Sequence, residues 1–335
     1  MKTKTDYSIQ NLRIDITVII VNYRSWGHLR NCLSNLLDIP QDDFTLEVIV
    51  VDNCSNDGCL TEFSNEFPQI KFIENTINGG FSNGCNFGAE QAQGNYLLFL
   101  NPDALATKLA LLTMLQLSSK HPNYGVISCR KMTKKGVPET EARLFPKFAR
   151  LFGLFRSVDN WISKKKLEQR FNASKQLIFP DWVSGSVFFM SRGWFDKLGG
   201  WNEDYWLYLE DVDFCKRISD AGGKIALIRT AEIVHNHGGA SRSNIKTAAL
   251  TKVEVIISKH VYFQKHFKGI VKFLAQTLFV IVTFIIKLIF AIVGLVFFFV
   301  PKLKVNTFIF INLIKYYVSA LAKFTWISKR SVNYL

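Results

Sequence analysis

Aspartate and histidine residues at two places in the chain have the chemistry of a divalent metal site. Asp103 follows Asn101 and Pro102 at the end of an apolar run, and His235 and His237 follow another such run. Carboxylate oxygens and imidazole nitrogens are suitable ligands for Mg²⁺ or Mn²⁺, and such an ion can neutralise the phosphates of a leaving nucleoside diphosphate. Asn-Pro-Asp also begins many turns, but its place after a predicted strand favours the metal interpretation. His235 is the preferred partner because it ends a strand, with His237 as the alternative.

A second group of acids, Glu210, Asp211 and Asp213, opens a predicted helix. The positive end of a helix dipole stabilises carboxylates there, so helix capping alone explains Asp213. Asp211 is different because it follows an aromatic stretch suited to stacking on a sugar, made of Trp201, Tyr205, Trp206 and Tyr208. Burial beside such rings would raise the pKa of the carboxyl and suit Asp211 to general-base catalysis.

The elements that must position these residues alternate between short β-branched runs and helix-like stretches, a pattern typical of a parallel α/β sheet. The predicted strands are 17–22, 46–52, 70–74, 96–101 and 124–129, and the predicted helices lie near 26–37, 58–67, 82–93 and 108–120. Ligands of open α/β sheets bind outside the carboxyl ends of the strands. Asp52 lies at such an end, where it either accepts hydrogen bonds from a nucleobase or ribose or forms an Asx turn with Ser55.

The glycines do not form a known nucleotide-binding fingerprint. No G-x-G-x-x-G follows the first predicted strand and no Walker A sequence is present, which argues against a dinucleotide-binding fold and a P-loop. Gly80, Gly84 and Gly88 recur every four residues at the start of a predicted helix. This spacing predicts either close packing of the helix on the sheet or close approach to a ligand, for which Gly79 and Gly80 are better placed.

A series of short motifs, in order along the chain, resembles the family 2 glycosyltransferases of the GT-A fold. The motifs are Val21-Asn22-Tyr23, Val51-Asp52-Asn53-Cys54-Ser55-Asn56-Asp57-Gly58, Asn78-Gly79-Gly80-Phe81, Asn86-Phe87-Gly88, Leu100-Asn101-Pro102-Asp103, Gly199-Gly200-Trp201-Asn202-Glu203, Tyr208-Leu209-Glu210-Asp211-Val212-Asp213 and His237-Gly238-Gly239-Ala240-Ser241. The resemblance covers residues 14–260 and is nearest to the bacterial rhamnosyltransferase-like branch that assembles surface polysaccharides. It implies an α/β fold with a mainly parallel central sheet.

The resemblance also implies an inverting, metal-dependent transfer of a hexose, with rhamnose as a candidate, from a nucleoside diphosphate sugar to a glycan or lipid-linked glycan acceptor. Asp52 is expected to bind the nucleotide base, Asp103 to coordinate Mn²⁺ or Mg²⁺ on the diphosphate, and Asp211 to remove the acceptor proton. The expected donor-binding residues are Asn22, Tyr23, Asp52, Asn53, Asn78, Gly80, Phe81, Asn86 and Asp103; the acceptor-binding residues are Trp182, Gly185, Trp201 and Glu210; the metal ligands are Asp103, His235 and His237. The chain departs from the family in two respects. Asn-Pro-Asp offers one carboxylate where many relatives have two, so metal binding is expected either to be weaker or to depend on a histidine. In addition, His235 and His237 compete for the single histidine role.

Two other functions share some of these features. A membrane-anchored GT-A scaffold that has lost turnover would keep the fold, but the presence of Asp52, Asp103 and Asp211 together argues against it. A nucleotidyltransferase would also need an α/β fold with carboxylates, but it would place a basic phosphate-binding loop early in the chain. Asn22-Tyr23-Arg24 stands there instead and is not glycine-rich.

The net charge of +14 is concentrated near the C-terminus. Residues 255–335 hold eleven Lys and Arg and no acidic residue, and they include the apolar stretch 273–300. Basic and apolar character together predict attachment to an anionic membrane and argue against nucleic acid as a partner. About 20 helical residues cross a bilayer core, so the stretch is long enough for one tilted span in spite of Lys287 near its middle. A re-entrant or in-plane pair of helices hinged near Lys287 is the first alternative. A buried pair of helices in a soluble protein is the second.

These patterns divide the chain into an N-terminal extension (1–13), a GT-A domain (14–260) and a basic hydrophobic membrane-attachment tail (261–335). Within the domain, residues 14–129 form the nucleotide-binding half and 130–260 the acceptor half. The six scattered cysteines favour a reducing compartment, and the polar residues 1–10 argue against a signal peptide. We therefore expect attachment to the cytoplasmic membrane with the catalytic domain on the cytosolic face, where nucleotide sugars are made.

The basic stretch 130–175 contains four phenylalanines at helical spacing, Phe145, Phe148, Phe152 and Phe155. The spacing predicts one helical face. That face is expected either to be buried core or to contact a membrane or a lipid-linked acceptor.

Overall fold

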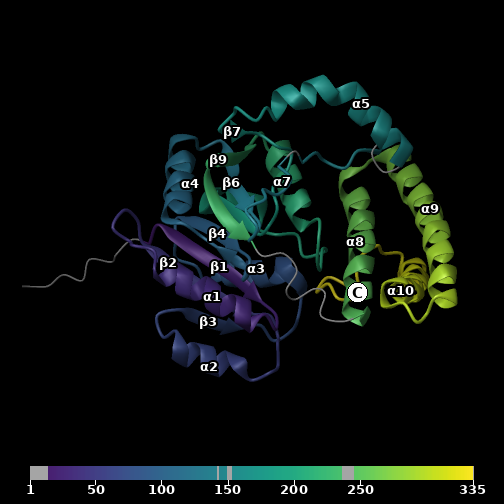
Figure 1. The fold of residues 1–335 in the computed structure, drawn as a ribbon, viewed down its shortest axis with the longest axis horizontal. Coiled ribbons are helices and arrows are strands. Elements are labelled where there is room, and N and C mark those ends of the chain that lie inside the picture. The colour runs from purple at the N-terminus through teal and green to yellow at the C-terminus, as the bar shows by residue number, and fades with distance from the viewer. Residues whose placement is uncertain (1–13, 142, 149–152, 236–244, 335) are drawn as a thin grey trace, which may run out of the picture.

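The computed structural model describes residues 14–141, 143–148, 153–235 and 245–334 (Figure 1). The predicted N-terminal extension therefore lies outside the described residues. The strands are β1 (Ile16–Asn22), β2 (Leu46–Asp52), β3 (Lys71–Glu74), β4 (Tyr96–Leu100), β5 (Ala104–Leu105), β6 (Tyr124–Met132), β7 (Leu177–Ile178), β8 (Val187–Ser191) and β9 (Lys224–His235). The helices are α1 (Trp26–Leu37), α2 (Cys59–Glu66), α3 (Gly80–Glu90), α4 (Lys108–Lys120), α5 (Gly153–Arg170), α6 (Arg192–Leu198), α7 (Glu210–Asp220), α8 (Ile245–His266), α9 (Gly269–Val296) and α10 (Pro301–Lys323).

The described strands form one sheet in the order β3-β2-β1-β4-β8-β6-β9-β5, with β7 paired to β9. The first four of these are parallel neighbours, and β6 and β9 are also parallel to each other. β8 runs antiparallel between β4 and β6, and the short strands β5 and β7 run antiparallel to β9. The prediction of an α/β fold with a mainly parallel sheet is confirmed, and β8 is the antiparallel strand at its centre.

The N-terminal strands form where the sequence predicts them because their β-branched side chains are buried on both faces of the sheet. Val18 and Ile20 of β1 pack into one core cluster with residues of α1 and α4, while Ile19 packs into a second cluster with residues of α3 and α7. The parallel register pairs Asn22 with Asp52. Both polar residues therefore lie at the same edge of the sheet.

The repeated glycines of α3 allow that helix to lie directly on the sheet. A Cβ atom at Gly84 would be 2.7 Å from a methyl group of Val21, and one at Gly88 would be 2.6 Å from a methyl group of Ile19. Side chains at these two positions would push the helix away from β1. The packing interpretation is confirmed for Gly84 and Gly88.

The prediction of one helical face from Phe145 to Phe155 is wrong. α5 begins only at Gly153, and Phe145 lies outside any helix, with its backbone N–H donating to the Asp181 carboxylate at 2.8 Å. Pro146 explains the difference, because a proline disfavours the helical conformation of the residue before it. Phe152 and the side chain of Phe155 lie outside the described part of the chain.

The C-terminal helices α8, α9 and α10 lie together to one side of the sheet (Figure 1). α8 continues past residue 260, the predicted end of the catalytic domain. α9 is one continuous helix through Lys287, which excludes the alternative of two helices hinged near that residue. The chain turns at 297–300, and Pro301 suits the first position of α10. α10 packs on α9, since the Thr307 hydroxyl donates to the Ala291 carbonyl at 3.3 Å.

Apolar side chains remain exposed along α9, among them Phe273, Ile281, Ile285, Ile289, Phe290 and Ile292. Among the described residues, two helical segments are long and apolar enough to cross a membrane, Gly269–Val296 and Leu303–Lys323. Length and composition alone support this. The second segment adds a candidate span beyond the one predicted from the sequence.

Candidate active site

The ends of β1 and β2 place Asn22 and Asp52 side by side. Asp52 is 2% exposed and accepts hydrogen bonds from both the backbone N–H and the hydroxyl of Ser55. Burial raises the pKa of its carboxyl above the ordinary value, although the bonds from Ser55 oppose this shift. The Asx turn is therefore present. Asn22 accepts from the Ser25 N–H at 3.2 Å, while its buried side-chain nitrogen has no hydrogen-bond partner among the described residues.

Neutral amides connect the next two loops at this edge. The Asn53 side-chain nitrogen donates to the Asn78 side-chain oxygen at 3.2 Å and to the Gly80 carbonyl at 3.0 Å. Its oxygen accepts from the Asn75 side chain at 3.0 Å. The turn at 78–81 is thereby fixed to the end of β2. Three of the residues predicted to bind the sugar donor, Asn53, Asn78 and Gly80, come together there.

The other residues predicted to bind the sugar donor differ in how accessible they are. Tyr23 is 40% exposed beside this edge. The Asn86 amide is fully engaged, because it accepts from the Trp201 N–H at 2.8 Å and donates to the Trp201 carbonyl and the Glu203 carboxylate. Trp201, predicted for the acceptor, is itself 2% exposed and packs edge-on against Phe99 in the core. These two residues hold the loop after Gly200 in place.

Asp103, which follows β4, and His235, at the end of β9, meet in space although the sequence separates them widely. The Asp103 carboxylate lies 3.3 Å from Nε2 of His235, and Nδ1 of the same ring lies 2.7 Å from the Glu139 carboxylate. Burial alone would lower the pKa of the His235 imidazole, but the two carboxylates outweigh it and raise that pKa. His237 lies outside the described residues. The described residues contain no cluster of three potential ligands.

Glu139 is a site residue that the sequence analysis missed. Its carboxylate pairs with Lys131 at 3.0 Å and with Arg143 at 3.5 Å, in addition to His235. Burial would raise the pKa of Glu139, but the bond to His235 and the nearby Lys131 ammonium lower it to about 2. The only feature of the sequence that could have indicated a role for Glu139 is its place as an acid in a basic stretch. Nothing in its spacing connects it to residue 235.

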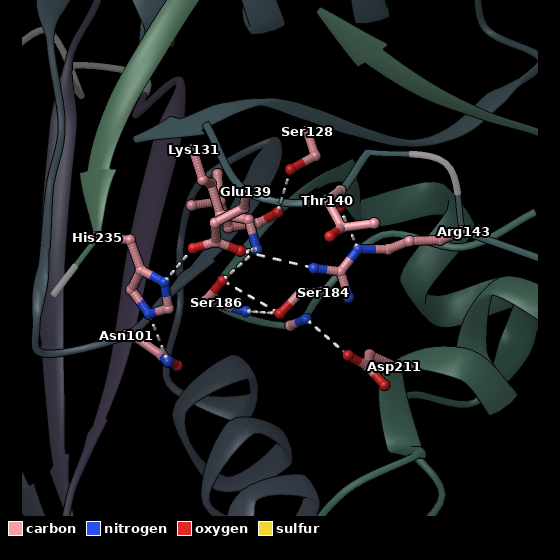
Figure 2. Close-up of polar contacts among 12 residues, drawn as sticks. Asn101, Ser128, Lys131, Glu139, Thr140, Arg143, Ser184, Ser186, Asp211 and His235 are labelled. Carbon is pink, nitrogen blue, oxygen red and sulfur yellow. Dashed lines mark hydrogen bonds and ion pairs between the residues drawn. The ribbon is translucent and has the colours of Figure 1, made fainter. Parts of the chain in front are cut away.

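A chain of polar contacts runs from Glu139 to the predicted base (Figure 2). The Lys131 ammonium, itself buried, donates to the Ser186 hydroxyl at 2.9 Å, and Ser186 and Ser184 share a hydrogen bond of 3.2 Å. The next backbone N–H, that of Gly185, donates to the Asp211 carboxylate at 3.1 Å. The strand β6 and the turn before β8 therefore connect the metal side of the site to the base side.

Asp211 lies in the first turn of α7, with part of its surface exposed. Its carboxylate accepts from the N–H groups of Gly185 and Val212. Burial raises the pKa of this carboxyl above its ordinary value, opposed by those two hydrogen bonds and by the positive charges of Arg143 and Lys131. The carboxyl of the adjacent Glu210 is more deeply buried, and burial together with the charge of Asp211 raises its pKa.

Trp182 and Arg143 lie on the side of Asp211 that was predicted to bind the acceptor. The guanidinium of Arg143 stacks on the Trp182 ring at 4.5 Å, and the indole N–H donates to the Leu144 carbonyl at 3.2 Å. Trp182 also packs against both the catalytic core and the cluster formed by α8, α9 and α10. A charged and aromatic surface therefore lies between Asp211 and the C-terminal helices.

The prediction that Asp213 caps its helix is wrong. The N-cap residue of α7 is Leu209, which makes no side-chain cap. The Asp213 carboxylate instead pairs with Arg217 at 2.8 Å and with His266 of α8 at 2.7 Å. It connects the catalytic domain to the C-terminal helices, which spacing within one helix could not reveal.

Two family profiles match the chain. That of "Glycosyl transferase family 2" matches residues 17–199, and that of "N-terminal domain of galactosyltransferase" matches residues 173–237. The first match contains Asp103 and the other residues predicted to bind the sugar donor, and the second contains Asp211 and His235.

Three curated relatives align with most of the chain. The low-salt glycan biosynthesis hexosyltransferase Agl10 of Haloferax volcanii is 27% identical over 232 residues, covering 68% of this chain and 69% of the relative. The N-acetylglucosaminyl-diphospho-decaprenol L-rhamnosyltransferase of Mycobacterium tuberculosis is 24% identical, covering 66% and 76%. The rhamnosyltransferase WbbL of Escherichia coli K12 is 24% identical, covering 78% and 93%.

Two solved structures share the fold. The crystal structure of GalNAc-T7 with UDP, GalNAc and Mn²⁺ aligns with a TM-score of 0.53 and 17% identity, covering 73% of this chain and 48% of that one. The structure of S. aureus TarS 1-349 in complex with UDP aligns with a TM-score of 0.50 and 15% identity, covering 79% and 70%. The predicted GT-A fold is confirmed.

Proposed function

Because the chain belongs to glycosyl transferase family 2 and resembles rhamnosyltransferases, we propose that it transfers a hexose from a nucleoside diphosphate sugar to an acceptor hydroxyl. Rhamnose is the leading candidate for the hexose, and the transfer inverts the anomeric carbon. The observation that carries this proposal is the position of Asp211. Its carboxylate, at the start of α7, accepts from the Gly185 N–H, and polar contacts from the same turn lead through Lys131 and Glu139 to His235 (Figure 2). Asp103 lies 3.3 Å from the other nitrogen of that ring.

Asp211 is the general base in this proposal. Its carboxylate takes the proton of the acceptor hydroxyl while the acceptor oxygen attacks the anomeric carbon from the side opposite the leaving group. The bond between that carbon and the diphosphate oxygen breaks, and the electron pair leaves with the nucleoside diphosphate. The raised pKa of Asp211 strengthens it as a proton acceptor, and the positive charge of Arg143 favours the ionised form that accepts the proton.

The donor nucleotide binds at the edge formed by β1, β2 and the turn at 78–81. Asp52 can accept a further hydrogen bond from the base or ribose, and the side-chain nitrogen of Asn22, which has no partner among the described residues, can donate one. Gly80 and Phe81 bring the backbone of the turn to the same edge. Tyr23 offers an exposed ring for stacking on the base.

The residues present fit a divalent ion that is shared with the substrate. Asp103 and Nε2 of His235 lie close enough to bind one ion together, and Mg²⁺ commonly takes one or two protein ligands and completes its shell with substrate phosphates. When bound, Mn²⁺ or Mg²⁺ would stabilise the charge on the leaving diphosphate. Glu139 fixes the orientation of the His235 ring through Nδ1, as partners of metal-binding histidines generally do.

The acceptor binds between Asp211 and the stacked pair of Arg143 and Trp182, where an aromatic ring suits a sugar and a guanidinium suits a phosphate. A relative acts on a diphospho-decaprenol substrate, and the acceptor side of this chain faces its apolar C-terminal helices. A lipid-linked glycan is therefore the acceptor class that we propose.

The tail attaches this catalytic domain to the cytoplasmic membrane, with the donor site on the cytosolic face. The exposed apolar side chains of α9 and the basic residues at both ends of that helix support attachment. Fractionation of cells that express the full chain tests it. We expect the protein to stay in the membrane pellet after high salt and carbonate; recovery in the supernatant would contradict insertion.

A screen of sugar nucleotides tests the function itself. The purified full chain is incubated with UDP-, dTDP- and GDP-activated hexoses and deoxyhexoses, with and without Mn²⁺, and with a polyprenyl-diphosphate-linked acceptor sugar. We expect metal-stimulated transfer from one nucleotide class. Tight nucleotide binding without transfer from any donor would instead support an inactive scaffold.

A further inference from the structure

The residues that follow α10 return to the catalytic domain. We call residues 325–334 the C-terminal segment and residues 201–209 the bridging loop. The Ser331 hydroxyl donates to the Glu203 carbonyl at 2.6 Å, and the Asn333 side-chain nitrogen donates to the Asp204 carboxylate at 2.8 Å. The C-terminal segment therefore binds one face of the bridging loop through specific hydrogen bonds.

The bridging loop also contacts the donor turn at 78–81. The Trp206 carbonyl accepts from the Phe81 N–H at 3.0 Å, and the Trp206 indole N–H donates to the Asn78 carbonyl at 3.0 Å. Gly80 has φ +89°, and a Cβ atom there would lie 1.9 Å from the Trp206 carbonyl oxygen. Because these contacts involve the backbone of the turn, the position of the bridging loop determines the shape of the donor turn.

The bridging loop ends in a strained conformation just before the predicted base. Tyr208 and Leu209 have positive φ angles of 71° and 62°, and neither is glycine. A non-glycine residue with this backbone conformation is strained and persists only where its surroundings hold it. The Ser258 hydroxyl of α8 donates to the Leu207 carbonyl at 2.8 Å and supplies one such constraint.

The C-terminal segment is itself fixed to the C-terminal helices. The Tyr316 hydroxyl of α10 donates to the Trp326 carbonyl at 2.8 Å, and the Trp326 ring stacks on His260 of α8 with centroids 4.5 Å apart. The Ser328 hydroxyl donates to the Glu254 carboxylate of α8 at 3.0 Å. The segment can therefore transmit the position of α8 and α10 to the bridging loop.

We propose that the C-terminal segment is a positioning element of the donor site. It keeps the bridging loop in contact with the donor turn and stabilises the strained backbone of Tyr208 and Leu209 that precedes Asp211. Arg330 adds to this contact by placing its guanidinium 5.2 Å from the centre of the Trp206 ring. The tail thus completes the nucleotide site in addition to attaching the protein to a membrane. This inference rests on the proposed function, since it assigns the turn at 78–81 to the donor.

The test changes one contact in the full-length chain and then restores it. Asn333→Asp replaces the amide, which donates a hydrogen bond to Asp204, by a carboxylate of nearly the same shape that repels Asp204. We expect nucleoside diphosphate affinity, measured by calorimetry with UDP, dTDP and GDP in Mn²⁺, to fall about tenfold. The double variant Asn333→Asp with Asp204→Asn places a donor opposite an acceptor again and is expected to recover most of the affinity.

Two further variants keep the result interpretable. Ser331→Ala removes one hydroxyl and introduces no new charge, so it should lower affinity in the same direction by about threefold. Lys329→Ala removes an exposed charge from the same segment and should leave affinity unchanged. Unchanged affinity in both Asn333→Asp and Ser331→Ala, or no recovery in the double variant, would overturn this inference. A wild-type chain that binds none of the three nucleotides would overturn the proposed function as well.

Discussion

The donor side and the base side of the site are held in different ways. Neutral amides such as Asn53 and Asn78, close in sequence to the strand ends, shape the donor side. The base side, taken together with the metal side to which it is connected, depends on charged residues from distant segments, among them Lys131, Glu139 and Asp211. Each neutral hydrogen bond contributes little, whereas a buried charge that loses its partner is costly. The base side should therefore be the more sensitive to single substitutions.

Asp211→Asn should have the largest effect. The amide keeps the shape of the side chain but cannot take the acceptor proton, so transfer should fall by about 10²–10⁴-fold while nucleotide affinity stays nearly the same. Initial rates and calorimetry on the same preparation separate the two quantities. Asp220→Asn, at the exposed end of the same helix, is the matched control. Retention of more than about a tenth of the wild-type rate would contradict the assignment of the base.

Glu139→Gln should come next. An amide cannot hold the His235 ring as the carboxylate does and leaves Lys131 without its charged partner, so Mn²⁺ affinity should fall by about 10–100-fold. Electron paramagnetic resonance titration of Mn²⁺ in the presence of nucleotide measures this directly. Glu141→Gln is the control, because Glu141 pairs with Arg130 and Arg229 away from the ring. Equal losses in both variants would indicate general destabilisation.

Asn53→Ala probes the donor side and should have a smaller effect. It removes bonds to Asn78 and Gly80, so the donor KM should rise about tenfold with little change in kcat. Asn123→Ala, at an exposed position before β6, should change neither quantity. If kcat fell more than KM rose, Asn53 would belong to the transition-state machinery and the contrast between the two sides would be lost.

Glu254→Gln tests the helices behind the site and should mainly affect stability. Burial raises the pKa of Glu254 to about 7 in the folded chain, against about 4.3 in an unfolded one. The unfolded state then loses its proton first as the pH rises, so wild-type stability should fall between about pH 4 and 7. The glutamine variant should lack this fall and be more stable at pH 8 by about 1–3 kcal/mol. Thermal unfolding at several pH values measures it, with the exposed Glu232→Gln as control.

The donor half of the fold was predictable because its determinants are local. The ranges predicted for α1, α4 and β2 agree with the structure, since β-branched runs and helix-like stretches alternate without interruption there. The amide loops follow from their place at strand ends.

The base half was only partly predictable because its partners meet through the tertiary fold. Asp211 and the Asp103–His235 pair were expected, but Glu139 reaches His235 only because the segment after β6 folds back beside the end of β9. The return of the C-terminal segment to the bridging loop likewise has no periodic pattern in the sequence. A single proline, Pro146, was enough to end a predicted helical face.

The stereochemistry of the product tests the central claim most directly. Nuclear magnetic resonance of the glycoside formed from a donor of known anomeric configuration gives the outcome of the reaction at that carbon. Single displacement assisted by Asp211 predicts an inverted configuration, with no product from Asp211→Asn on the same timescale. A product that retains the donor configuration would contradict this mechanism, because attack from the side opposite the leaving group must invert the anomeric carbon.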